Sequence, residues 1–201
     1  MTASLDSTDS ATQTPSRHRL RRTLAASSRS LLYCLLLPAL AIGAVAATLV
    51  GRAQAAAGWW RWLRTRVLRV PPVQVRRPRG VLAATGHALL SLLLGVVALV
   101  PLGIEALFIA RCALYGLVDR GPYTDSWGGP TAAGAWLAHF LVGIPFAVAG
   151  LLALAGIAAM HQRLSRALDG ERPAAWLIPV ALVISPLGAL FFVAWLRQLP
   201  S

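Results

Sequence analysis

Long apolar runs separated by arginine clusters are the feature that most limits how this chain can fold. The runs cover Leu31–Val50, Val81–Val118, Ala132–Met160 and Ala174–Leu196, and few charged residues interrupt them. A helix of about 20 apolar residues can cross the ~30 Å hydrocarbon core of a bilayer. With 57% hydrophobic and 13% charged residues, the chain has too few polar groups to cover a soluble globule. We therefore predict an all-α, integral membrane helical bundle with about four transmembrane helices.

The pattern divides the chain into three regions. Residues 1–30, rich in Ser, Thr and Arg, are predicted to form a disordered basic tail. Residues 31–173 are predicted to form the membrane domain, and residues 174–201 an additional C-terminal transmembrane helix. A cleavable secretory signal ending near Ala55 is an alternative for the first run. The run is longer than the usual apolar centre of about 7–15 residues, which favours a membrane span.

The run Val81–Val118 is too long to be a simple span. As one straight helix it would measure about 57 Å, nearly twice the hydrocarbon core. We expect a crossing within Val81–Leu102, a kink near Pro101 and a second helix at the outer surface, with two short spans as the alternative. Glu105 and Arg111 are candidate membrane-embedded charges in this run. They lie about 240° apart on a helix, so each either finds a partner on another span or marks the outer interface.

The arginine distribution predicts the orientation of the chain in a bacterial inner or plasma membrane. Residues 51–80 contain eight arginines and 161–173 contain three, whereas 119–131 contain one arginine and two acids. Because cytoplasmic loops are enriched in basic residues, we place 51–80 and 161–173 in the cytoplasm and 119–131 outside. The side of the N-terminus stays open, because a single crossing by Leu31–Val50 would place the five arginines of the tail outside.

A short amphipathic helix is predicted within Trp59–Val70, lying in the plane of the cytoplasmic surface. Trp59, Trp62 and Leu63 fall on one side and most arginines on the other, and such helices bind anionic headgroups. A plain basic loop is the alternative. The candidate headgroup contacts are Trp59, Trp60, Arg61, Trp62, Arg64, Arg66 and Arg69.

Small residues recur at helical spacing in two of the runs. Close backbone approach at such residues holds membrane helices together, either within the bundle or across a homodimer. One stripe comprises Ala84, Ala88, Ser91, Gly95 and Ala98, and the other Gly143, Ala147 and Gly150.

No residue pattern indicates catalysis, a cofactor or a metal. The nucleotide-binding, hydrolase and metalloprotease motifs are absent, and none of the four histidines lies at metal-ligand spacing from another ligand type. The arginines flank apolar runs, as topology determinants do, so we expect a bilayer and not nucleic acid as the partner of the basic segments. The chain is predicted to be non-enzymatic.

One stretch resembles a known family. Trp127-Gly128-Gly129-Pro130-Thr131, with His139 after it and His161-Gln162-Arg163-Leu164-Ser165-Arg166-Ala167-Leu168 further on, is similar to the sensor membrane domain at the N-terminus of many bacterial histidine kinases. The resemblance covers roughly residues 31–170, although the first apolar unit is about half the length usual in that family. It implies a stand-alone sensor or accessory domain that relays an envelope or membrane signal to a separate kinase or transcriptional regulator.

The sensing residues of such a domain are expected in the predicted outer loop and at the start of the next helix, where polar and aromatic groups concentrate. The candidates are Asp119, Arg120, Tyr123, Asp125, Trp127 and His139. A small transporter component and a structural membrane scaffold are the alternative functions.

Overall fold

The computed structural model describes residues 14–72, 80–118, 120–171 and 176–197. These residues form helices joined by turns and loops, and no strand occurs among them, which confirms the all-α prediction. The elements are α1 (Thr14–Leu49), α2 (Ala53–Arg66), α3 (Val81–Leu107), the π-helical η1 (Phe108–Ala113), α4 (Tyr115–Val118), α5 (Ala132–Arg166), the 3₁₀ turn η2 (Ala167–Asp169) and α6 (Leu177–Leu196).

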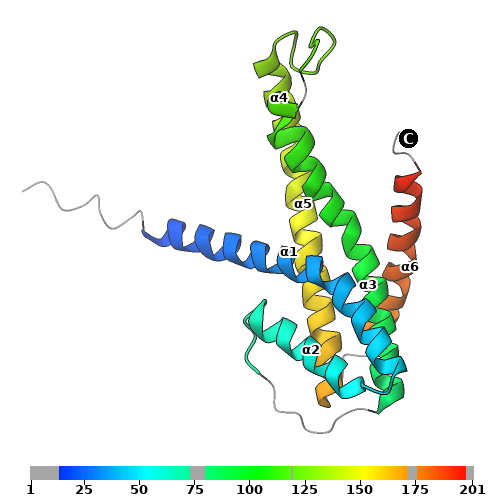
Figure 1. Ribbon diagram of the computed structural model, residues 1–201. Helices are drawn as coiled ribbons and strands as arrows, with labels where there is room; N and C mark the ends of the chain where they lie inside the picture. The colour runs from blue at the N-terminus through cyan, green and yellow to red at the C-terminus, as the bar shows by residue number, and fades with distance from the viewer. Residues whose placement is uncertain (1–13, 73–79, 119, 172–175, 198–201) are drawn as a thin grey trace, which may run out of the picture.

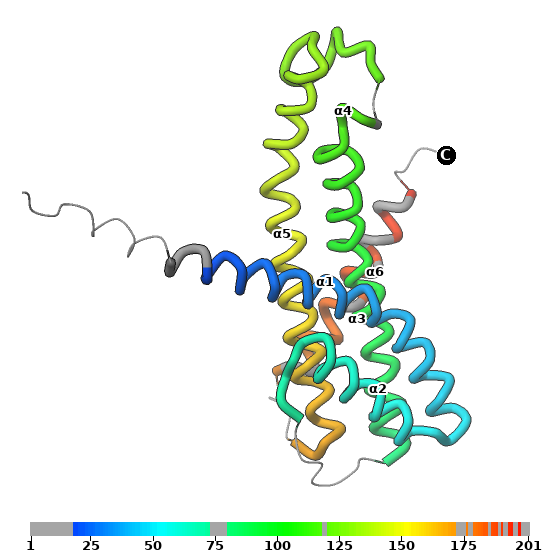
Figure 2. Tube along the Cα trace, turned by 60° about the vertical axis from the view of Figure 1, so that its left-hand side comes forward, coloured from blue at the N-terminus to red at the C-terminus, as the bar shows by residue number. Residues whose placement is uncertain are grey.

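Two long helical rods form the centre of the molecule. One consists of α3, η1 and α4 in succession, and the other is α5, which runs antiparallel beside it (Figure 1). Helix α1 crosses both rods and contacts each of them (Figure 2). After the turn at its end, α2 runs back below α1, and α6 packs along α3. Among the described residues, α1, α2 and α6 lie toward the lower part of the rods, whereas the upper end holds η1, α4, the start of α5 and the loop before it (Figure 1).

Helix α1 begins well before the first apolar run. Residues 14–30 are helical, so the prediction of a disordered tail is wrong for this part, and residues 1–13 lie outside the described ones. Arg, Ala and Leu are strong helix formers, and Pro15 is tolerated in the first turn, where its missing N–H costs no hydrogen bond. Residues 18–26 are exposed and extend away from the two rods (Figure 1).

The first apolar run is one uninterrupted helix. It continues to Leu49 and ends in a tight turn, in which Gly51 has a φ of 76° that favours glycine. The run therefore extends in one direction and does not fold back on itself as a hairpin.

Among the described residues, three helical segments are long and apolar enough to cross a membrane: His18–Leu49, Val81–Ala113 and Ala132–Asp169. The chain is thus compatible with a multi-pass membrane protein. The fourth predicted span falls on α6, where the described apolar stretch is the shorter Pro179–Gly188, so four spans stay a prediction.

The segment Val81–Val118 runs in one direction throughout and does not divide into two antiparallel spans (Figure 1). Pro101 lies inside α3, and the helix continues past it. The irregular part comes later, at η1, where the backbone widens into a π-helix before α4. Such π-helical turns are rare and occur frequently at functional sites.

Both small-residue stripes pack inside the chain. In the first, Ala88, Ser91 and Ala98 are fully buried, and a Cβ atom on Gly95 would stand 3.0 Å from Cα of Pro38 on α1. In the second, a Cβ on Gly143 would stand 2.6 Å from Sγ of Cys112. Gly95 thus lets α1 approach α3 closely, and Gly143 lets η1 approach α5.

The basic segments and the polar loop lie at opposite ends of the rods. The described parts of 51–80 and 161–173 are at the lower end, and residues 120–131 are at the upper end (Figure 1). This separation is compatible with the predicted orientation, and the assignment of each end to one side of a membrane remains a prediction.

Candidate functional site

Two groups of side chains stand out, one at each end of the rods. The first, the outer pocket, is a cavity of about 290 Å³ between the upper part of the α3 rod and α5. Its walls are mostly apolar, with Leu107, Val142 and Phe146 among them, and its polar lining comes from Arg111, Trp127 and His139. Three residues singled out from the sequence therefore meet at one cavity.

Aromatic contacts fix the polar edge of the outer pocket. The ring of His139 stacks on that of Tyr115, with centroids 4.0 Å apart and an angle of 11° between the planes. The Trp127 ring stacks on the same His139 ring, with centroids 6.3 Å apart and an angle of 28° between the planes. Nδ1 of His139 lies 2.8 Å from the Ala135 carbonyl and donates to it, because a carbonyl can only accept. The indole N–H of Trp136 donates to the Ala113 carbonyl (3.1 Å), which ties α5 to the end of η1.

The helix that carries His139 starts with a side-chain cap. The hydroxyl of Thr131 accepts a hydrogen bond from the backbone N–H of Gly134 (3.2 Å), and Thr131 has the extended backbone of an N-cap residue. The turn before it brings Gly128, at a φ of 94°, against the backbone of Gly134. The Trp-Gly-Gly-Pro-Thr sequence thus folds the loop back onto the start of α5.

Three other predicted sensing residues, Arg120, Tyr123 and Asp125, do not line the outer pocket. The ring of Tyr123 lies 6.5 Å from that of Tyr115. Arg120 and Asp125 are exposed in the loop, and Asp119 lies outside the described residues.

Glu105 and Arg111 occupy different environments. Glu105 is buried with Oε1 packed against Gly150 and without a hydrogen-bond partner, whereas Arg111 is exposed at the outer pocket. No ion pair joins them in the described structure, as the angular separation on the helix predicts.

The second group, the inner polar cluster, lies where α1, α2, α3 and α5 meet. His161 is fully buried and bridges two other elements: its Nδ1 is 2.7 Å from the Tyr33 hydroxyl, and its Nε2 is 2.8 Å from Oγ of Ser91. Ser91 donates its own hydrogen to the His87 carbonyl at 2.7 Å. Its oxygen must therefore accept from Nε2–H of His161, which leaves Nδ1 to accept from Tyr33.

A second histidine completes the inner polar cluster. Ser165 donates to the His161 carbonyl (2.8 Å), so its oxygen accepts from Nε2–H of His87 at 3.3 Å. With both imidazoles neutral, each of these hydroxyl hydrogens and ring N–H groups has an acceptor. A buried polar network satisfied in this way rigidifies the surrounding core.

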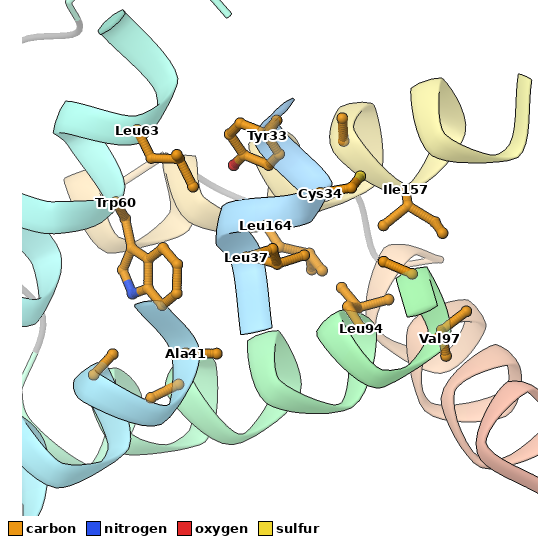
Figure 3. Packing of buried hydrophobic residues seen from close by; sticks show 14 of the residues in the cluster. Tyr33, Cys34, Leu37, Ala41, Trp60, Leu63, Leu94, Val97, Ile157 and Leu164 are labelled. Carbon is orange, nitrogen blue, oxygen red and sulfur yellow. The ribbon is translucent and has the colours of Figure 1, made fainter. Parts of the chain in front are cut away.

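Trp60 on α2 closes the inner polar cluster from one side. Its indole meets the rings of His161 and His87 edge-on, with centroids 5.0 and 5.7 Å away, and only 1% of its surface is exposed. Trp60 and Leu63 point from α2 toward Tyr33 and Leu37 on α1 (Figure 3). Helix α2 is therefore packed into the bundle through Trp60 and Leu63.

A buried ion pair joins the two basic segments. Arg64 on α2 donates through Nη2 to the carboxylate of Asp169 in η2, with 6% and 1% of the side chains exposed. Arg61 adds a second contact at 3.6 Å, and Gly170 ends the turn in the left-handed region at a φ of 93°. Nη1 of Arg64 is buried and has no hydrogen-bond partner among the described residues.

These contacts change the assignment of two predicted headgroup contacts. Trp60 and Arg64 are enclosed by protein, because the helix turns this face toward the rods, so neither reaches a lipid surface in this arrangement. Trp59, Trp62, Arg66 and Arg69 are exposed and Arg61 is partly exposed, and their contact with lipid stays a prediction. The helix also spans Ala53–Arg66 and not Trp59–Val70, because Arg69 leaves the helical region with a φ of 57°.

Sequence reasoning missed the inner polar cluster, although a local signal for it exists. The motif His-x-x-x-Ser occurs twice, at His87–Ser91 and His161–Ser165. This spacing places His and Ser on the same helix face, one turn apart. Two such pairs on adjacent apolar helices predict a shared polar contact in the interior.

No group of three or more potential metal ligands occurs in the described part of the chain. The residues of the outer pocket and of the inner polar cluster therefore offer hydrogen bonds, aromatic surface and charge. No protein family, curated protein or solved structure matches this chain.

Proposed function

We propose that this chain is a non-catalytic membrane sensor or accessory protein that passes a signal from its outer pocket to a separate partner at its basic end. The partner would be a histidine kinase or a transcriptional regulator. The observation that carries the proposal is that the same two rods, α3–η1–α4 and α5, line the outer pocket and hold the inner polar cluster. A small relative shift of the two rods at the outer pocket would therefore also change their relative position at the inner polar cluster.

The two ends are suited to different parts of this role. The outer pocket is open, and its lining includes exposed side chains such as Trp127 and Val142. At the inner end, α2 is held against the rods by Trp60 and by the Arg64–Asp169 ion pair. A shift between the rods would change the fit of Trp60 between the two histidines and move α2, which carries exposed arginines toward a partner.

The non-catalytic assignment rests on the direction of the hydrogen bonds in the only close Ser–His contacts of the described structure. Ser91 and Ser165 both donate their hydrogens to helix carbonyls, and both are fully or almost fully buried. A nucleophilic serine donates its hydrogen to the histidine base instead and is open to substrate.

The test measures the inner end while the outer end is changed. Spin labels at exposed positions 62 and 163 report the distance between α2 and α5 in proteoliposomes. We expect Trp127→Ala combined with Asp125→Ala to shift this distance distribution and to alter association with the partner. Thr23→Ala, in the exposed part of α1, is the control and should leave both unchanged. If the loop variants altered neither the distance nor any partner interaction, the signalling role of the loop would be abandoned.

A further inference from the structure

We propose that the outer pocket binds one anionic membrane phospholipid, with an acyl chain in the cavity and the phosphate at Arg111. This inference rests on the proposed function, because it names the ligand class of the same pocket. Its test reads lipid binding directly and needs no partner.

The shape and lining of the cavity suit a hydrocarbon chain. Its volume of about 290 Å³ is close to the lower end of small-ligand sites, roughly 300 Å³. Apolar side chains from both rods form most of its wall. Part of the wall is the close approach of η1 to α5, where Phe108 and Cys112 pack against Gly143.

Access to the cavity is lateral. Leu107 (41% exposed), Val142 (46%) and Phe146 (61%) line the outer pocket and also form part of the apolar outer surface of the rods. Each of the two rods contains a segment long and apolar enough to span a membrane. A lipid chain can therefore enter from the bilayer without crossing a polar barrier, whereas a soluble solute would have to leave water first.

The charge at the edge of the cavity selects an anionic headgroup. Arg111 is exposed at the outer pocket, and no ion pair with it occurs among the described residues. The nearest acid along the described helix, Glu105, packs against Gly150 instead. An arginine near the end of an apolar segment reaches the headgroup level, and its guanidinium binds phosphate with two parallel hydrogen bonds.

The aromatic groups beside Arg111 fit the depth of a headgroup. Trp127 and His139 stack at the same edge of the cavity. Tryptophan favours the boundary between headgroups and hydrocarbon, where its ring is apolar and its N–H is hydrated. Arg111, Trp127 and His139 therefore mark a polar rim above an apolar cavity, which is the order of groups in a phospholipid.

Cys112 provides a built-in reporter for the test. It lines the outer pocket and is partly exposed, whereas Cys34 is fully buried and donates its thiol to the Leu154 carbonyl. The purified full chain in a neutral maltoside detergent is treated with a maleimide, and peptide mass spectrometry reads each cysteine separately. Cys34 is the internal control for unfolding.

We expect dioleoyl-phosphatidylglycerol to slow alkylation of Cys112 at concentrations about tenfold below those of dioleoyl-phosphatidylcholine, as expected for one charge-assisted contact. Native mass spectrometry should show one retained phosphatidylglycerol. Arg111→Gln should remove the tenfold preference, and Arg111→Lys should keep most of it. Arg22→Gln, which changes an exposed arginine on α1 away from the cavity, should leave it intact.

A second pair of variants tests the cavity itself. Val142→Trp places a large ring in the cavity and should abolish protection of Cys112 by either lipid. Ile144→Trp lies on the same helix, also exposed but outside the lining, and should not. Circular dichroism and the Cys34 labelling rate confirm that each variant is folded.

Three results would overturn the inference: equal protection by the two lipids, an unchanged preference in Arg111→Gln, or equal protection by inorganic phosphate alone. The last would identify a soluble anion as the ligand. If phosphatidylglycerol bound as expected while the distance between positions 62 and 163 never changed, the lipid site would stand and the signalling role would fail.

Discussion

The inner polar cluster and the outer pocket are built on the same two rods but use polar groups in opposite ways. In the inner polar cluster, Tyr33, Ser91 and His161 are fully buried, and every hydrogen bond that His161 offers is used within the protein. In the outer pocket, Arg111 is exposed and Trp127 has 69% of its surface exposed. The inner polar cluster is thus enclosed where four helices meet, and the outer pocket leaves polar and aromatic groups exposed. Polar groups that bond within the protein and polar groups that are exposed are therefore separated along the rods.

The strongest way to break this contrast is to remove one partner of the buried ion pair. Asp169→Asn leaves the Arg64 guanidinium buried without a counter-charge, and we expect a loss of about 3–5 kcal/mol in the free energy of unfolding. Denaturation in detergent with increasing fractions of dodecyl sulfate, followed by circular dichroism, measures it. Asp125→Asn, the same exchange in the exposed outer loop, should have almost no effect. Equal losses in the two variants would contradict the contrast.

The second-largest loss in the free energy of unfolding is expected where the backbones of α1 and α3 come into contact. Gly95→Ala adds a methyl group 3.0 Å from Cα of Pro38, so the helices must separate, at a cost of about 1–3 kcal/mol. Gly86 lies on the same helix with no atom within 4 Å of its Cβ position, and Gly86→Ala should instead stabilise by about 0.5–1 kcal/mol. The same denaturation series compares the two, and effects of the same sign would show that the α1–α3 contact is looser than described.

The hydroxyl of Ser91 tests the inner polar cluster in the same range. Ser91→Ala leaves Nε2–H of His161 without its acceptor in a fully buried position, which costs about 1–3 kcal/mol. Thr85→Ala removes a hydroxyl that only bonds back to its own helix, at Val81, and serves as the matched control. A loss in Thr85→Ala as large as in Ser91→Ala would mean that the bridge to His161 adds nothing.

The smallest stability effect is expected at the outer pocket. Trp127→Ala removes an exposed ring from the cavity edge, so the free energy of unfolding should change by less than about 0.5 kcal/mol. The alkylation rate of Cys112 should nevertheless rise, because Trp127 and Cys112 line the same cavity. A large destabilisation with an unchanged labelling rate would contradict the expectation that Trp127 covers the cavity and contributes little to stability.

Much of the fold follows from residue patterns because membrane helices are set by local composition. The lengths of the apolar runs predict the helices, and the Ala84–Ala98 stripe predicts a face of close packing that the structure uses. Two residues of the outer pocket, Trp127 and His139, could also be predicted, since the loop and the start of α5 are adjacent in sequence. Arg111 was predicted as an embedded charge, but its place at the same cavity depends on how the two rods align.

The remainder depends on contacts between distant segments. Trp60 and Trp62 both suit a membrane surface by composition, and only the docking of α2 decides that Trp60 is buried while Trp62 stays exposed. The helical start of α1 was missed because Ser, Thr and Arg favour a solvated tail by composition, although arginine also favours helix. Asp169 offers no local indication of its role, since Arg64 is 105 residues away.

The long sequence separations in the inner polar cluster have a consequence for how the protein is made. Tyr33 precedes its partner His161 by 128 residues, and Arg64 precedes Asp169 by 105. At a synthesis rate of about 5–20 residues per second, α1 and α2 wait on the order of 5–25 s before α5 emerges. During this interval the Tyr33 hydroxyl and the Arg64 guanidinium have no protein partner of their own chain. The inner end is therefore the last part of the molecule to close, although its first two helices are the first to leave the ribosome.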